Sequence, residues 1–294
     1  MKKTKSKLSI VVATHNRPYL LSKCIESLLS QERKRVEIIV VDSSDHKNNK
    51  TYTKNIKYFY VNKKGLSGSR NTGFNRAMGE FVAFIDDDAI AGSSWIKEIL
   101  SFIKRHPNVQ AFGGGYSRYS LKPLPEWFPP SYGINNLGNK ERVLKIGREW
   151  LSGTNMIFKK ELLIKLGGFD ENLGMKGESI GYGEETDLQS RIYKTGGKIY
   201  YSPKLKVNHL VATKKISLKW LLVNRFKLGL TSSKAKNLDR NAPSHLYGLV
   251  VGFVDILKWM TKPERIPIKR RTYYALGRLS GELGALYSLI KGTK

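Results

Sequence analysis

Short apolar runs alternate with amphipathic segments through the first third of this chain, and this alternation constrains the fold more than any other feature. Four runs rich in β-branched and aromatic side chains are typical of buried strands: residues 8–13, 36–41, 57–61 and 81–85. Apolar residues recur at helical spacing after Pro18, between about 67 and 78, and from Trp95 onward. Strands that are apolar on both faces and alternate with helices predict βαβ units around a mostly parallel sheet. We therefore expect the α/β class.

The regular pattern stops near residue 116. From there to about 148 the sequence is rich in proline, glycine, asparagine and aromatic residues, which predicts a long loop or lid. Regular spacing resumes with four segments, at residues 154–158, 160–166 (helix), about 184–194 (helix) and 198–201 (strand). We expect these elements to complete one domain over residues 1–210.

Charge is distributed unevenly along the chain. The 294 residues include 52 Lys and Arg and 24 Asp and Glu, a formal net charge of +28. Residues 203–294 hold 19 of the basic residues and only 4 of the acidic ones, and their leucines keep helical spacing. Such a field attracts nucleic acid, anionic lipid or phosphate-bearing small molecules. We expect residues 211–294 to form a basic, mainly helical C-terminal region.

Cysteine content and hydropathy narrow the cellular setting. The single cysteine, Cys24, excludes an intramolecular disulfide framework and a multi-cysteine metal cluster, which suits a reducing compartment. The sequence has no run of roughly 18 apolar residues, the length that a membrane-spanning helix requires. The apolar run behind the N-terminal lysines is too short for a signal peptide. We expect a cytoplasmic protein, soluble or peripheral to a membrane.

In so basic a chain the placement of the acidic residues is informative. Six of the 24 lie in two clusters, Asp86-Asp87-Asp88 and Glu184-Glu185-Thr186-Asp187. The first cluster directly follows a predicted strand, and open α/β sheets bind ligands outside the carboxyl ends of their strands. Three adjacent carboxylates repel one another unless a cation neutralises them, and oxygen ligands suit Mg²⁺ or Mn²⁺. The alternative is an acidic loop that stabilises the start of the next helix through its dipole.

Two further segments lie where a nucleotide would bind an α/β sheet. Asp42 ends the second predicted strand, where its carboxylate can accept hydrogen bonds from a nucleobase or ribose, or can form an Asx turn. Residues 65–73 place glycines and hydroxyl groups at a helix start, with Arg70 positioned to reach a phosphate. Each signal is weak alone.

The motifs become specific in their order along the chain. The first half contains Thr14-His15-Asn16-Arg17, Val41-Asp42-Ser43-Ser44, the segment 65–71 and Phe84-Ile85-Asp86-Asp87-Asp88. The second half contains Ser152-Gly153-Thr154-Asn155-Met156, the segments 167–171 and 183–188, and Val207-Asn208-His209. This order, over about residues 7–210, resembles that of family 2 glycosyltransferases with the A-type nucleotide-sugar-binding fold.

The resemblance implies a donor site for a nucleotide diphospho-sugar, which we expect to be a UDP-sugar. Thr14, Asn16, Arg17 and Asp42 would hold the uracil and ribose, and Arg70 would approach the base or diphosphate. Asp86 and Asp88 match the ends of the family's Asp-x-Asp motif, with Asp87 between them at the donor. They would bind Mn²⁺ or Mg²⁺, with Asp88 the more direct ligand. His209 matches a further metal contact of some relatives, or is a structural histidine at a strand end.

The resemblance also implies a catalytic base and an acceptor site. Glu185 lies where the family's Glu-Asp motif places its catalytic Asp, so the base here would be longer by one methylene. Glu184 and Asp187 are alternative bases, and all three acids also suit the first turn of a helix. Gly153 and Asn155 match positions that line the junction of sugar and acceptor. Trp127 and Trp150 are candidates for an acceptor wall, or pack within the loop.

The sequence therefore predicts an inverting enzyme that transfers a sugar to the hydroxyl group of a glycan, lipid-linked or protein acceptor. The metal would neutralise the leaving diphosphate while the base deprotonates the acceptor. Such transfers build cell-surface polysaccharides and glycoconjugates, and the basic tail would hold the enzyme on the anionic inner face of the membrane. One rival is a non-catalytic nucleotide-sugar-binding relative, against which the intact acidic motifs argue. The other, a nucleic-acid-binding protein, does not explain acids at strand ends, and no recognition motif supports it.

Overall fold

The computed structural model describes residues 7–32, 34–47, 56–177, 181–234 and 268–290, together with 246, 249–251, 253–254 and 257. Contacts divide the chain into two compact units. The first comprises residues 1–119, 133–179 and 184–210. The second comprises residues 120–132, 180–183 and 211–294. Its first two segments come from the region that the sequence assigns to the N-terminal domain.

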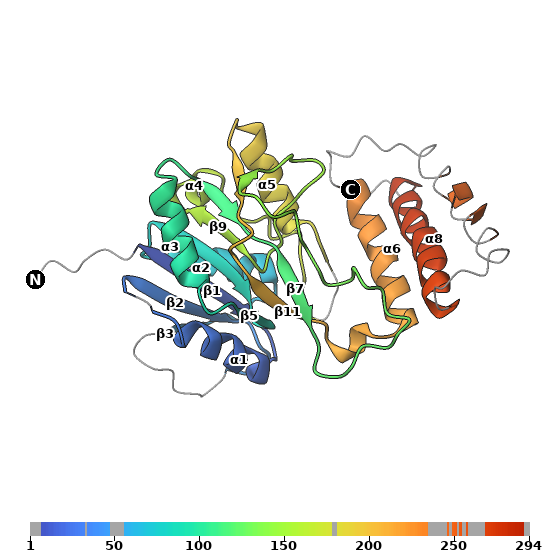
Figure 1. Ribbon diagram of the computed structural model, residues 1–294, viewed down its shortest axis with the longest axis horizontal. Coiled ribbons are helices and arrows are strands. Elements are labelled where there is room, and N and C mark those ends of the chain that lie inside the picture. The colour runs from blue at the N-terminus through green and yellow to red at the C-terminus, as the bar shows by residue number, and fades with distance from the viewer. Residues whose placement is uncertain are drawn as a thin grey trace, which may run out of the picture. The chain divides into compact units, whose positions relative to one another are not determined.

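A sheet in the strand order β3–β2–β1–β4–β9–β6–β10–β8 forms the centre of the first unit (Figure 1). The first four strands are parallel to one another, and β9 is antiparallel to both of its neighbours. The bounds are β1 Leu8–Thr14, β2 Val36–Asp42, β3 Ile56–Tyr60, β4 Phe81–Asp86, β6 Ala111–Gly113, β8 Arg142–Val143, β9 Met156–Lys159 and β10 Ile199–Tyr201.

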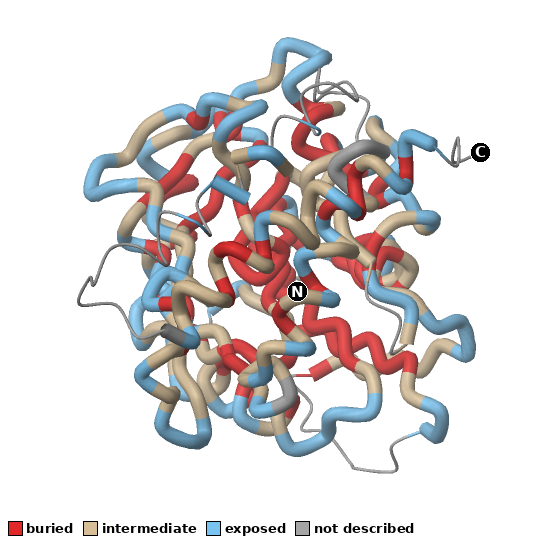
Figure 2. Tube along the Cα trace, turned by 90° about the vertical axis from the view of Figure 1, so that its right-hand side faces the viewer, coloured by how far each residue is buried: buried red, intermediate tan, exposed pale blue. Residues whose placement is uncertain are grey.

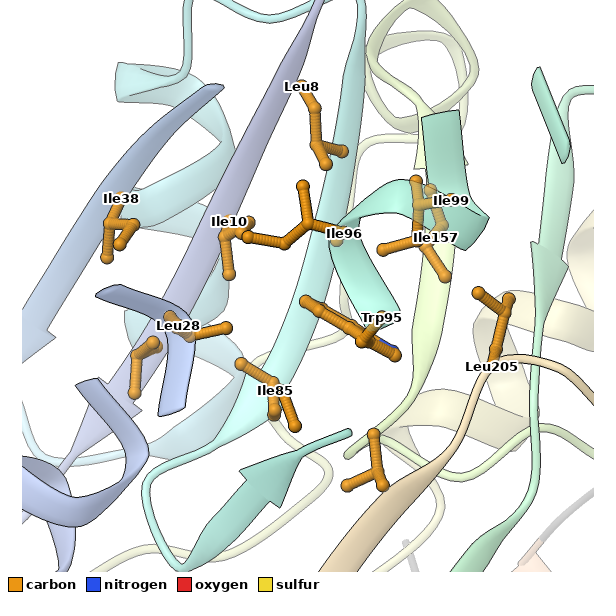
Figure 3. Packing of buried hydrophobic residues seen from close by; sticks show 14 of the residues in the cluster. Leu8, Ile10, Leu28, Ile38, Ile85, Trp95, Ile96, Ile99, Ile157 and Leu205 are labelled. Atoms are coloured by element: carbon orange, nitrogen blue, oxygen red, sulfur yellow. The ribbon is translucent and has the colours of Figure 1, made fainter. Parts of the chain in front are cut away.

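Helices cover both faces of this sheet because alternate strand residues are apolar on both sides. Ile10 and Ile38 point into a cluster shared with α1 and α3, whereas Val11 and Ile39 point into one shared with α2, α4 and α5. Figure 3 shows Trp95 of α3 packed among the strand residues of the first cluster. Strands β1, β2 and β4 are largely buried, and Figure 2 draws buried residues in red. The helices are α1 Pro18–Leu29, α2 Leu66–Arg76, α3 Trp95–Arg105, α4 Lys160–Lys165 and α5 Glu184–Lys194.

A second, three-stranded sheet, in the order β5–β11–β7, was not predicted from the sequence. Its strands have only three or four residues each: β5 Ala89–Ala91, β7 Tyr116–Tyr119 and β11 Val207–Leu210. Strand β11 is antiparallel to β5 and parallel to β7. The predicted long loop at 116–148 is thus only partly correct, since it contains β7 and β8.

The second unit contains the predicted tail helices. Helix α6 (Leu218–Lys234) packs closely against α8 (Ile268–Ile290), with a 3-10 turn (Thr213–Lys215) before α6. Glycines permit the close approach, because a Cβ at Gly229 or Gly284 would collide with the backbone of the facing helix. Phe128, Val211, Leu221 and Tyr273 form the core of this unit. None of the helices within the described residues is both long enough and apolar enough to cross a bilayer.

Candidate active site

The acidic triplet lies at the carboxyl edge of the parallel strands. Asp86 ends β4, in register with Ala13 of β1, and the chain then turns through Asp87 and Asp88 into β5. Helix α2 lies close to β1 because Gly73 has no side chain; a Cβ there would collide with Val11. Arg70, one turn earlier on α2, is thereby brought to the same edge.

His209 joins the triplet through the second sheet. Strand β11 pairs His209 with Ala89 of β5, and the Leu210 N–H donates to the Asp88 carbonyl at 3.0 Å. The His209 Nε2 lies 3.1 Å from Asp88 Oδ1 and 3.7 Å from Asp86 Oδ2. One ligand atom from each of Asp86, Asp88 and His209 lies within 4.8 Å of the others. The two carboxylates suit Mn²⁺ or Mg²⁺, and the imidazole nitrogen favours the transition metal Mn²⁺ of the two.

Two arginines compensate the charge of the triplet, which corrects the expectation that a cation alone would do so. Arg17 places Nη2 2.8 Å from Asp87 Oδ1 and Nη1 2.9 Å from Asp88 Oδ2. Thr14 donates its hydroxyl to Asp87 Oδ2 at 2.6 Å. Burial raises the pKa of Asp87 to about 7 although Arg17 opposes the shift. Thr14 and Arg17, expected at the base and ribose, therefore contact the triplet here.

Arg70 links the triplet to the second acidic cluster. Its side chain is 3% exposed, and it donates from Nη2 to Asp86 Oδ1 and from Nη1 to Glu184 Oε1, both at 2.9 Å. Its guanidinium also lies 5.6 Å from the centre of the Phe169 ring. Gly153 packs directly on this guanidinium, where a Cβ would collide with it. Arg70, which was expected at the base or diphosphate, therefore pairs with two carboxylates here.

The three acids at the start of α5 have different surroundings. Glu184 is buried and bound by Arg70, and Asp187 accepts a 2.8 Å bond from Arg191 one turn later. Glu185 Oε2 is buried and has no hydrogen-bond partner among the residues described here. Burial, followed by the charge of Glu184, raises the pKa of Glu185 well above its usual value. Of the three, Glu185 has the environment of a proton acceptor.

Asp42 and Asn16, at the ends of β2 and β1, are held by hydrogen bonds to neighbouring loop residues. Asp42 Oδ2 accepts from the Tyr58 hydroxyl at 2.7 Å, and its Oδ1 accepts from the Ser44 N–H at 2.9 Å, which is an Asx turn. Asn16 has a positive φ of 55° and exchanges side-chain and backbone bonds with Asp45. Both residues lie at the edge where the sequence predicts the nucleotide.

The residues expected at the acceptor have different surroundings. Asn155 is fully buried: its amide nitrogen donates to the carbonyls of Gly115 and Leu205, and its oxygen accepts from the Trp95 indole. Asn155 was expected to line the sugar–acceptor junction, but its side chain lies in the interior. Trp150 is half-buried in the first unit. Trp127 belongs to the second unit and packs edge-on against Phe128.

Tyr116 is a site residue that sequence reasoning missed. Its ring centre lies 5.4 Å from that of His209, because β7 runs parallel to β11. Burial raises the pKa of its phenol, and the charges of Asp86 and Glu185 raise it further. A single aromatic at the start of a proline-rich segment carries no signal for this position.

Comparison with known proteins identifies the family. Residues 9–167 match the model of the glycosyl transferase family 2. The chain belongs to this family. The match confirms the family expected from the motif order.

Relatives of this family 2 member act in glycolipid and polysaccharide synthesis. It is 29% identical over 237 residues to a glucosyl-dolichyl phosphate glucuronosyltransferase of Haloferax volcanii, covering 76% of this chain and 75% of the relative. It is 25% identical to the succinoglycan biosynthesis protein ExoM of Rhizobium meliloti, over 94% of this chain and 93% of that one. A Pyrobaculum calidifontis mannosyltransferase, solved with GDP-Man and Mn²⁺, superposes with a TM-score of 0.60 at 16% identity, covering 99% and 89%. The predicted fold is confirmed.

Proposed function

We propose that this glycosyltransferase moves a sugar from a UDP-sugar to a hydroxyl group of a lipid-linked or glycan acceptor, with inversion, in cell-surface glycoconjugate assembly. The observation that carries the proposal is the convergence of Asp86, Asp88 and His209, which Arg70 joins to Glu184, the neighbour of Glu185 and its buried, unpartnered Oε2. A cation site next to a carboxylate with raised proton affinity supports displacement of a diphosphate by a hydroxyl group. Lipid-linked acceptors are suggested by the name of the Haloferax relative.

The residues around the triplet fit a divalent cation. Asp86, Asp88 and His209 would hold it, and when bound it would neutralise the negative charge of the leaving diphosphate. Arg70 keeps one oxygen of Asp86 engaged, which orients the other toward His209. Thr14 fixes the Asp87 carboxylate and thus the turn that carries the triplet.

Glu185 is the proposed base. Its raised pKa makes it a stronger proton acceptor than an ordinary glutamate, and Arg70 offsets part of the shift. Asp187 is paired with Arg191 and Glu184 with Arg70, whereas the buried Oε2 of Glu185 has no hydrogen-bond partner among the described residues. The acceptor hydroxyl would transfer its proton to Glu185 while its oxygen attacks the anomeric carbon on the face opposite the diphosphate.

The test is a screen of UDP- and GDP-sugars with lipid-linked acceptors, with Mn²⁺, with Mg²⁺ and with EDTA. We expect turnover of a UDP-sugar that needs the cation, and a product whose anomeric configuration, read by NMR, is inverted. Asp88→Asn should lose nucleotide binding and its metal response together. A chain that binds UDP but transfers no sugar to any acceptor would be the non-catalytic relative. Retention of configuration would contradict single displacement.

We also propose that the region 211–294 attaches the enzyme to an anionic membrane. Val250, Phe253 and Leu257 are helical, about 60% exposed, and spaced as on one helix face. Nineteen basic residues in 203–294 add attraction for anionic headgroups, about 1 kcal/mol for each one near the surface. Sedimentation with anionic liposomes should show salt-sensitive binding that Phe253→Glu weakens. Equal binding to neutral liposomes would contradict the electrostatic part.

A further inference from the structure

Arg17 occupies an unusual place for a residue expected to bind the nucleotide base. It lies between β1 and the first residue of α1, and its side chain is 45% exposed. Its guanidinium nevertheless contacts Asp87 and Asp88, whose side chains are 0% and 6% exposed. An arginine head group with two bonds is therefore inserted into the acidic triplet from the solvent side.

The contact with Asp88 competes with cation binding. Asp88 Oδ1 lies 3.1 Å from His209 Nε2, while its Oδ2 is taken by Arg17 at 2.9 Å. A divalent cation held by Asp86, Asp88 and His209 would bring two positive charges next to the guanidinium. Like charges at such short range repel strongly in a partly buried site. Arg17 and the cation therefore favour different arrangements of the same carboxylate.

We propose that Arg17 is an internal counter-ion of the triplet that is released to the donor's diphosphate when the cation takes over Asp88. The inference rests on the proposed donor site and gives Arg17 a positioning role there. Its guanidinium stays charged at any working pH and suits bidentate contact with phosphate oxygens. Release is feasible because nearly half of the side chain is exposed, and because Thr14 still holds Asp87 by its other oxygen.

The proposal predicts opposite effects of one substitution on cation and nucleotide affinity. In Arg17→Gln, Mn²⁺ should bind the nucleotide-free protein about tenfold more tightly, measured by EPR titration of free Mn²⁺. At saturating Mn²⁺, UDP should bind about tenfold more weakly, measured by calorimetry. Arg17→Lys keeps the charge but cannot bridge two carboxylates, so its Mn²⁺ affinity should lie between those of the wild type and Arg17→Gln.

Controls separate this role from folding and from the proposed function. Arg76→Gln removes the same charge from an exposed arginine of α2 and should change neither affinity. Melting curves of each variant identify loss of structure. If nucleotide-free Arg17→Gln binds Mn²⁺ with an affinity equal to or lower than that of the wild type, Arg17 is not a counter-ion and the inference is wrong. If the Mn²⁺ affinity rises but no sugar donor is turned over, the counter-ion role stands and the proposed transferase reaction fails.

Discussion

Arg70→Met tests whether the buried guanidinium of Arg70 holds the two acidic clusters together. Arg70 is 3% exposed and bonds Asp86, 24% exposed, and Glu184, 6% exposed. Breaking a buried pair by removing one partner costs about 3–5 kcal/mol, since the remaining charge is left unpaired. Asp86 can gain water, so most of this cost comes from Glu184. Loss of the contact with Phe169 adds about 1 kcal/mol.

We therefore expect the variant to unfold about 4 kcal/mol more easily at neutral pH. For a unit of this size that is a fall of roughly 10 °C in melting temperature, at about 2–4 °C per kcal/mol. Calorimetry at pH 8 measures the difference.

Two further variants make the test specific. Arg70→Met/Glu184→Gln should recover much of the loss, because the glutamine leaves no buried charge. Arg148→Met, at an exposed position of the first unit, should shift the melting temperature by no more than about 1 °C. An Arg70→Met protein that melts within 2 °C of the wild type at pH 8 would refute the reasoning, as would a double variant no more stable than the single one.

Three other outcomes follow from the same geometry. Glu185→Gln should lower turnover by ~10²–10⁴ while UDP affinity stays unchanged. Because the pKa of Glu185 is raised, the wild-type kcat should increase with pH in a range well above that of an ordinary glutamate. The stability that Glu185 contributes below its unfolded pKa should be lost as the pH rises through its folded pKa. The Gln variant should show neither pH dependence in kinetics or in melting. Asp187→Asn removes only an ion pair within α5 and should cost about 0.5 kcal/mol with turnover retained; a loss of turnover would move the base to Asp187. Gly73→Ala should cost about 1–3 kcal/mol by denaturant unfolding because its Cβ collides with β1, whereas Gly68→Ala on the same helix meets only ordinary contacts and should be neutral or stabilising; equal costs would contradict the close packing of α2.

Local pattern was sufficient for the parallel half of the first unit. Its four strands are each apolar on both faces, and the helices between them carry their apolar residues at the right spacing, so neighbouring elements are specified by short stretches of chain. The position of the acidic triplet at a strand end follows from the same pattern. The very short strands β5, β7 and β11 were missed because three or four residues contain too little periodicity to detect.

The ordered series of motifs in the sequence was enough to determine the family and to place the acidic triplet at a strand end. The side chains that contact these acids were decided only by tertiary structure. His209 reaches Asp88 because β11 pairs with β5, and Arg70 reaches Glu184 because α2 lies flat on β1. The resemblance alone implied nucleotide contacts for both arginines and a place at the sugar–acceptor junction for Asn155. A charged or amide side chain takes whichever partner the fold leaves within hydrogen-bond reach in a poorly hydrated site, and that choice depends on strand register and helix packing over distant parts of the chain.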